Sequence, residues 1–124
     1  MANPNIVSVA SIYGKTVYDT DIATSASSLV NNAASSGKIF KINSLIISNI
    51  DGTNAADITV TLRNAAGGTT YSTLANTISV PADATLVVIS KDTSVYLEED
   101  MSLYVLASAA GDLSATCSYE EISE

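Results

Sequence analysis

Residues 38–63 read KIFKINSLIISNIDGTNAADITVTLR, and this stretch decides the fold class. Its first half is apolar at short intervals without a helical repeat, and Asp51-Gly52 is a strong turn signal. From Asp57 to Arg63, apolar and polar residues alternate, which is typical of a strand buried on one face. The stretch therefore predicts two strands joined by a turn.

The segment 38–50 is apolar on both faces when it is drawn as a strand. One face carries Phe40, Ile42, Ile46 and Ile50, and the other carries Ile39, Leu45 and Ile47. A two-sided apolar pattern predicts either a central strand or a strand that meets a neighbouring subunit.

Strand signals continue along the chain on both sides of this stretch, with turn residues at short intervals. Further strands are expected at 6–13, 16–20, 27–30, 74–80, 85–90, 95–97, 101–108 and 113–122, with turns at Gly14-Lys15, Gly67-Gly68 and Gly111-Asp112. This spacing predicts an all-β, antiparallel β-sandwich or jelly-roll-like fold of about eight strands. We expect one domain over residues 1–124, with residues 1–5 as a short N-terminal arm.

The low content of charged residues and the negative net charge limit the kinds of molecule that this chain is expected to bind. Of 124 residues, 15% are charged, against about 25% in typical soluble domains. The formal net charge of −8 argues against direct binding to nucleic acid. No apolar run approaches the ~18 residues of a membrane helix, and the start shows no secretory signal. So few charges predict that Ser, Thr and Asn cover much of the surface, or that partner subunits do.

The sequence contains few of the residues that enzymes commonly use for catalysis. The chain has no histidine and no tryptophan, so Ser-His-Asp and Cys-His catalysis are excluded. The single cysteine, Cys117, is expected to be a small core residue. Glu98, Asp100 and Glu120 are the acids that an enzyme would have to bring together, but turn acids more often lie in solvent. We predict no enzyme activity and no cofactor.

Two binding alternatives stay open. Asp51, Asn54 and Asp57 carry oxygens that suit a calcium ion, although turn chemistry explains Asp51-Gly52 without a metal, and no metal is predicted. The six tyrosines suit core packing or interfaces, and an exposed row of them would suit a lectin-like carbohydrate site.

Four stretches carry a resemblance to a known kind of protein. They are 38–60 (KIFKINSLIISNIDGTNAADITV), 78–86 (ISVPADATL), 96–99 (YLEE) and 117–123 (CSYEEIS). Together they resemble small virion structural proteins of tailed bacteriophages, notably of marine cyanophages. The resemblance runs over most of the chain from about residue 24 as a diffuse pattern of strands and turns. It implies a non-enzymatic structural subunit without a cofactor.

The resemblance and the low charge together favour an accessory capsid subunit of the decoration or cement type. A component of the neck, the tail or a fibre is the alternative, besides the lectin-like module. The expected partners are other virion proteins and further copies of the chain, with a trimer as the expected homo-oligomer, assembled in the host cytoplasm into the virion. The residues expected to contact neighbouring subunits are Ile6, Val7, Ile39, Leu45, Ile47, Val87 and Ile89.

Overall fold

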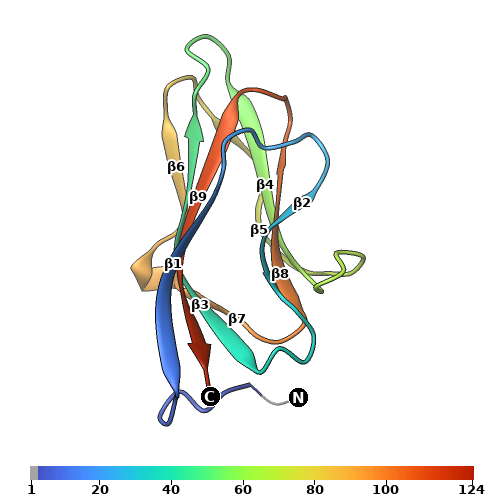
Figure 1. The fold of residues 1–124 in the computed structure, drawn as a ribbon. Coiled ribbons are helices and arrows are strands. Elements are labelled where there is room, and N and C mark those ends of the chain that lie inside the picture. Colours follow the sequence, from blue (N-terminus) through green and yellow to red (C-terminus); the bar gives the residue numbers. More distant parts are fainter. Residues whose placement is uncertain (1–2) are drawn as a thin grey trace.

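The computed structural model describes residues 3–124, which form nine strands and one short 3-10 helix (Figure 1). The strands are β1 (Ser11–Asp19), β2 (Ser27–Asn32), β3 (Lys38–Asn49), β4 (Ala56–Arg63), β5 (Thr70–Val80), β6 (Thr85–Ile89), β7 (Val95–Leu97), β8 (Met101–Ala107) and β9 (Leu113–Ser123). The helix, η1, spans Lys91–Thr93. Over residues 3–124, no helix has the length and apolar character needed to cross a membrane.

The strands form two antiparallel sheets that face each other across the core (Figure 1). One sheet has the order β1-β9-β3-β6, with β7 also paired to β3, and the other has the order β2-β8-β4-β5. Because β6 and β7 pair with successive parts of β3, they act as one interrupted strand. The chain is thus a rolled hairpin, in which β1 lies beside β9, β2 beside β8, and β4 beside β5. This is the jelly-roll arrangement, and the expected all-β sandwich is confirmed.

The core lies between the sheets and follows the alternation of the sequence in β4, β8 and β9. In β9, four residues at alternate positions are all at most 7% exposed: Leu113, Ala115, Cys117 and Tyr119. They face the inward residues of β4 and β8: Ile58, Val60, Leu103 and Val105. Burying such side chains stabilises the fold by about 25 cal/mol per Å² of apolar area removed from water.

A β-bulge explains the two-sided apolar pattern of β3. The pairing of β3 with β9 shifts register between Ile42 and Ser44. One extra residue reverses the facing of every side chain after it. Phe40 and Ile42 before the bulge, and Leu45 and Ile47 after it, are therefore all buried. β3 is a central strand, as expected, but its apolar residues mostly face one core.

The first expected strand, 6–13, is right only for residues 11–13, and the turn expected after it is wrong. Residues 6–10 lie before the sheet, and Gly14-Lys15 stands in the middle of β1 instead of forming a turn. Gly14 is tolerated there because β1 is an edge strand, and a Cβ at this position would meet no atom within 4 Å.

In the expected strand 74–80, simple alternation would put Leu74, Ile78 and Val80 on one inward face, but only Val80 of the three is buried. The pairing of β5 with β4 shifts register at three places, so β5 does not alternate regularly. Leu74 and Ile78 are 36% and 43% exposed, whereas Ala75 and Val80 are buried. The shifts and the edge position of β5 explain why simple alternation fails there.

Candidate assembly surface

Each sheet of the sandwich has two edges, and an edge strand offers unpaired N–H and C=O groups to another chain. The five-stranded sheet ends in β1 on one side and in β6 and β7 on the other. The four-stranded sheet ends in β2 and β5. Bulges, breaks and short strands make an edge a poor template for further pairing.

Three of the four edges carry such interruptions. The pairing of β2 shifts register between Ser28 and Val30, and that of β6 shifts opposite Leu45 and Ile46. η1 separates β6 from β7. β5 carries three shifts and a positive φ of 48° at Thr77, which is unusual for a β-branched residue.

β1 is the uninterrupted edge among the described strands. It pairs with β9 over nine consecutive residues, from Ser11 to Asp19, without a register shift. Every second N–H and C=O of an edge strand points away from its sheet. β1 thus offers a regular template along its whole length.

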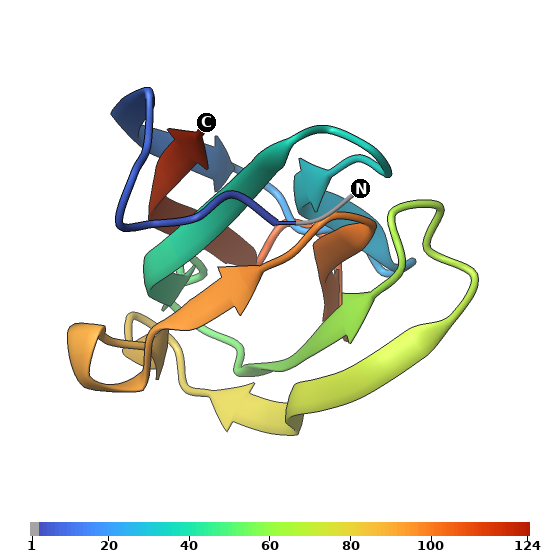
Figure 2. The same cartoon turned by 90° about the horizontal axis from the view of Figure 1, so that it is seen from below.

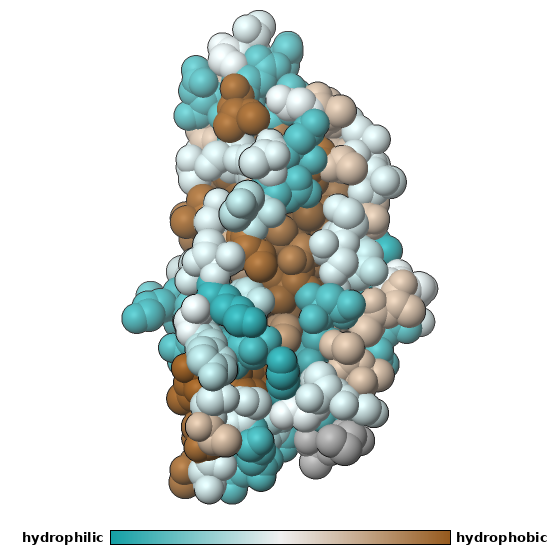
Figure 3. Space-filling view, in the orientation of Figure 1, coloured by the Kyte–Doolittle hydropathy of each residue, from teal (hydrophilic) through white to brown (hydrophobic). Residues whose placement is uncertain are grey.

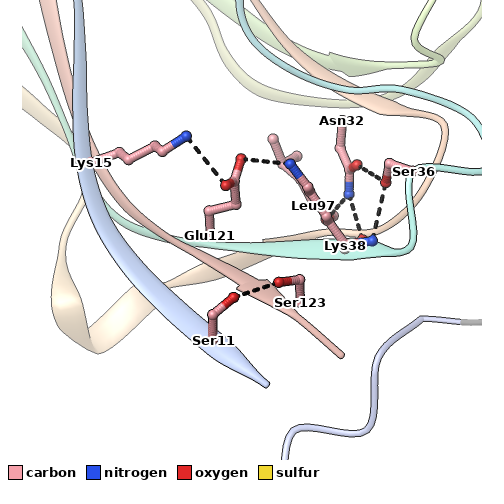
Figure 4. A network of polar contacts seen from close by, with 8 residues as sticks. All are labelled: Ser11, Lys15, Asn32, Ser36, Lys38, Leu97, Glu121 and Ser123. Atoms are coloured by element: carbon pink, nitrogen blue, oxygen red, sulfur yellow. Dashed lines mark hydrogen bonds and ion pairs between the residues drawn. The ribbon is translucent and has the colours of Figure 1, made fainter. Parts of the chain in front are cut away.

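Large side chains of β1 are left in solvent. Ile12, Tyr13 and Tyr18 are 54%, 59% and 73% exposed. The charges on this strand are Lys15 and Asp19. The Lys15 Nζ lies 3.2 Å from Glu121 Oε2, and the Lys38 Nζ lies 3.5 Å from Glu121 Oε1 (Figure 4). Edge lysines commonly discourage pairing, but here one carboxylate holds two lysines.

The face that carries β1 is also hollowed between the sheets, and apolar side chains show in the hollow (Figure 3). β1 and β2 border the two sheets on this side (Figure 1). Val17 of β1 and Leu29 of β2 are only partly buried and pack against the core. This side of the sandwich is therefore less fully closed by the chain itself.

The outer face of the five-stranded sheet carries a second apolar feature, here named the outer stripe. Its residues are Tyr18, Thr116, Ile46 and Val87, which are paired in turn across β1, β9, β3 and β6. Val87 is 55% exposed and Ile46 is partly exposed. Sequence reasoning missed Tyr18 and Ile46 as surface residues, because only the strand order brings them into one row.

The rows on both sides of the outer stripe are uncharged. They consist of Thr16, Ser118 and Ser44 on one side and of Ser114, Ser48 and Thr85 on the other. Three adjacent uncharged rows beside an open edge suit contact with another protein, because charged residues are depleted at interface centres.

The structure divides the seven residues expected to contact neighbours. Ile6, Val7 and Val87 are exposed, at 53%, 91% and 55%. The other four are at most 8% exposed: Ile39, Leu45, Ile47 and Ile89. Side chains buried within the domain cannot reach another subunit, so these four are corrected to residues that stabilise the fold. The bulge in β3 accounts for Leu45 and Ile47.

The N-terminal segment is folded back rather than extended as an arm, over its described residues. Asn3 donates to Glu98 Oε1 at 2.6 Å and accepts from the N–H of Glu99. Ala10 N donates to Ser123 O, and Pro4 is buried. The segment thus crosses the end of the five-stranded sheet (Figure 2). Residues 1 and 2 of the expected arm lie outside the described residues.

The three residues whose oxygens were considered for calcium do not form a metal site. Asn54 donates to Asp51 Oδ2, and Asp51 Oδ1 accepts from the N–H of Thr53, so these residues stabilise their own turn. The N–H of Asp57 donates to Ser108. Over residues 3–124, no group of three or more His, Cys, Asp or Glu side chains is placed to hold a metal ion.

The three acids considered for catalysis bind different parts of the molecule. Glu98 accepts from Asn3, and Asp100 accepts from the N–H of Ala65. Glu120 lies on β9, paired with Gly14 and Lys41. These contacts do not bring the acids together around one cavity.

A cavity of about 250 Å³ lies on the outer face of the four-stranded sheet. More of its lining surface is apolar than polar, and the residues that line it are Thr24, Asp57, Thr59, Thr77, Leu106, Ala107 and Ser108. The acids considered for catalysis do not line it. It also holds no aromatic side chain, which a sugar-stacking site would need.

The exposed tyrosines lie on separate edges. Tyr13 and Tyr18 are on β1, Tyr96 is on β7 at the other edge of that sheet, and Tyr71 is on β5 of the second sheet. They do not form the single row that a lectin-like platform would need.

Cys117 is fully buried in β9, as expected. Burial raises the pKa of its thiol to about 12. The thiolate is the reactive form, so the folded chain offers no accessible nucleophile at this position.

Comparisons with known proteins give similarity of fold. No protein-family model matches the chain, and no curated protein matches it. A solved structure of Bacillus endospore appendages, described as a family of disulfide-linked pili, is 18% identical over 90% of this chain and 88% of the other, with a TM-score of 0.51. The VP2 subviral particle of infectious bursal disease virus is 14% identical, with a TM-score of 0.41. That match covers 94% of this chain but only 34% of VP2.

Proposed function

We propose that this chain is a non-enzymatic structural subunit of a phage virion, serving as an accessory capsid protein of the decoration or cement type. The observation that carries the structural role is the uninterrupted edge strand β1 beside the outer stripe and its two flanking uncharged rows on the outer face of the same sheet. An edge of this kind, left open in a free monomer, is a hazard for aggregation, so its presence favours a chain that is covered in an assembly.

The mechanism is passive. Each copy buries exposed apolar side chains, among them Tyr18 and Val87, against its neighbours. Each Å² of apolar area removed from water contributes about 25 cal/mol, less the cost of ordering the partners. Many such contacts, repeated over an assembly, stabilise it without any chemistry.

The fold supports this role by analogy. Jelly rolls occur in capsid and lectin domains, and the similar Bacillus appendage protein forms pili. Fold analogy alone does not fix function, so the phage setting rests on the sequence resemblance to small virion proteins. The homo-oligomer, the virion partners and assembly in the host cytoplasm belong to the same proposal.

Linkage by disulfides does not carry over from the appendage protein. This chain has one cysteine, and Cys117 is fully buried between the sheets. Copies of the folded chain therefore associate through non-covalent contacts.

A neck, tail or fibre position is the alternative within the virion. Quantitative mass spectrometry of purified virions separates the two, because a protein that covers the capsid lattice outnumbers one that forms a single ring. A lectin-like module is the other alternative, and specific binding on a glycan array would favour it.

The proposal is tested by the variant Val87→Asp, which places a charge in the outer stripe. Its side chain is more than half exposed, so we expect a folded protein that incorporates poorly into virions. Leu74→Asp is the matched control, since Leu74 is also partly exposed but lies on β5 of the other sheet. Equal incorporation of both variants and the wild type would remove the outer stripe from the contact surface.

A further inference from the structure

We infer that β1 pairs antiparallel with β1 of a second copy, about a two-fold axis that passes through Val17. The inference rests on the proposed structural role and names the contact that starts the assembly. The occupant of the open edge is thus the chain itself. Three arguments carry it: the regularity of the edge, the charges along it, and its continuity with the outer stripe.

The strand pairing shows how regular the β1 edge is. An added strand needs a partner with regular spacing of N–H and C=O groups, and β1 has nine residues in unbroken register. The edges at β2, β5 and β6 carry register shifts. Pairing of two identical edges is closed by symmetry, as in most homodimers.

The charges specify one register. With Val17 on the axis, Lys15 of each copy lies opposite Asp19 of the other, and Thr16 lies opposite Tyr18. Opposite charges and pairs of β-branched or aromatic residues are the favourable cross-strand combinations. The five residues from Lys15 to Asp19 are therefore complementary to themselves when they run antiparallel.

The register centred on the middle of β1 is disfavoured. Lys15 is the central residue of the strand, so pairing over its full length would set Lys15 against Lys15. Like charges directly opposite each other destabilise a pair of strands. A shift of the axis by two residues replaces this repulsion with two ion pairs.

The existing partners of the two charges are compatible with this pairing. Lys15 is 3.2 Å from Glu121, on a side chain that is 45% exposed, so its ammonium group can approach a second carboxylate. Asp19 Oδ1 accepts from the N–H of Asp21, and a carboxylate accepts several hydrogen bonds. Lys15 therefore does not prevent another strand from pairing with β1.

The pairing also brings the two outer stripes next to each other, offset so that each stripe continues into the Thr16 row of the other copy. Tyr18 is the end residue of its stripe and the most exposed tyrosine, at 73%. In the paired sheet it would lie over Thr16 of the second copy, next to the uncharged rows of both molecules. The unit is a two-fold dimer, in contrast to the trimer expected from the sequence.

The test is a set of charge reversals, with dissociation constants measured by sedimentation equilibrium. Lys15→Glu and Asp19→Lys each place like charges opposite one another twice, and each is expected to weaken the dimer about tenfold. The double variant restores opposite charges, and its affinity is expected within about threefold of the wild type. Lys38→Glu is the control, because it makes the same change of charge beside Glu121 but lies on β3.

The outcomes separate this inference from the proposed function. A wild type that stays monomeric overturns the self-assembly itself. A dimer that is insensitive to Lys15→Glu and Asp19→Lys, or a double variant as weak as either single, overturns only the pairing through β1. If the variants fail to fold, hydrogen exchange of wild-type β1 decides. We expect its outward amides to gain protection with protein concentration, and unchanged protection contradicts the pairing.

Discussion

Asn32 and Asn49 each link the two sheets by hydrogen bonds, at opposite ends of β3. Asn32 Nδ2, from the four-stranded sheet, donates to Lys38 O and Leu97 O of the five-stranded sheet (Figure 4). Asn49 Nδ2, from the five-stranded sheet, donates to Val80 O of the other sheet and to Asn54 O. Both side chains are at most 4% exposed. The sandwich is thus tied across its core by two buried amides, one near each end.

Removing either amide should be costly, because it leaves buried carbonyl groups without a donor. We expect Asn32→Ala and Asn49→Ala each to lower the free energy of unfolding by about 3 kcal/mol, measured by urea denaturation. Asn31→Ala is the control, since Asn31 is exposed on the same strand as Asn32. A loss below about 0.5 kcal/mol in both buried variants would contradict a structural role for these bonds.

Gly67 and Gly68 should differ sharply although they are neighbours. Gly67 has a φ of +85°, and a Cβ there would overlap the ring of Tyr104. The guanidinium carbon of Arg63 lies 5.0 Å from the centre of this ring, and Arg63 donates to Gly67 O, so the ring has little freedom to move. We expect Gly67→Ala to lower the melting temperature by several degrees, about 1–3 kcal/mol.

Gly68→Ala is the matched control for this prediction. A Cβ at Gly68 meets open space, so its melting temperature should stay within about one degree of the wild type. Equal effects of the two substitutions would show that Tyr104 is not held in place by its neighbours.

Asp112 should make stability depend on pH in a particular direction. Partial desolvation, followed by its contact with Asp51, raises the pKa of Asp112. Folding then favours its protonated form, so this contribution is present in acid and is lost as the pH rises through the folded pKa. The neighbouring Asp51 has a lowered pKa, chiefly because it accepts from the N–H of Thr53, and contributes in the opposite sense.

Asp112→Asn removes the carboxyl group whose pKa is raised in the folded protein. We therefore expect this variant to be more stable than the wild type at pH 7, with the difference shrinking toward pH 3, when both are unfolded in urea. Asp92→Asn, in the exposed turn η1, removes the same charge as a control. A stability difference between Asp112→Asn and the wild type that grows as the pH falls would contradict this direction of pH dependence.

Cys117 should be inert in the folded protein. With its thiol buried and its pKa raised to about 12, a maleimide at pH 7 should label it only after denaturation. The mass of any oligomer should also be unchanged by a reducing agent. Rapid labelling of the native protein, or assemblies dissolved by reductant, would place the cysteine at the surface.

The sequence predicts this fold where a strand is regular and half buried. In β4, β8 and β9 the alternation alone identifies inward residues such as Ile58, Val105 and Cys117. It fails where a partner strand decides the facing. The bulge between Ile42 and Ser44 makes one apolar face of β3 resemble two, and for that reason Leu45 and Ile47 were predicted to be contact residues.

The candidate surface depends still more on long-range pairing. In the sequence alone, Gly14-Lys15 resembles a turn. Only the strand order shows that β1 is a continuous edge strand. Tyr18, Thr116, Ile46 and Val87 are scattered along the chain and meet only through three strand pairings. Val87 is one of the expected contact residues and is exposed, but the sequence contains no local signal for the row.

Self-association of the folded chain is the central claim, and light scattering after size-exclusion chromatography tests it most directly. The account predicts a mass that rises with concentration from 12.8 kDa toward a discrete multiple, twice that value for the β1 pair. A mass of 12.8 kDa that persists to concentrations on the order of 1 mM would contradict it, since an assembly contact weaker than this contributes little.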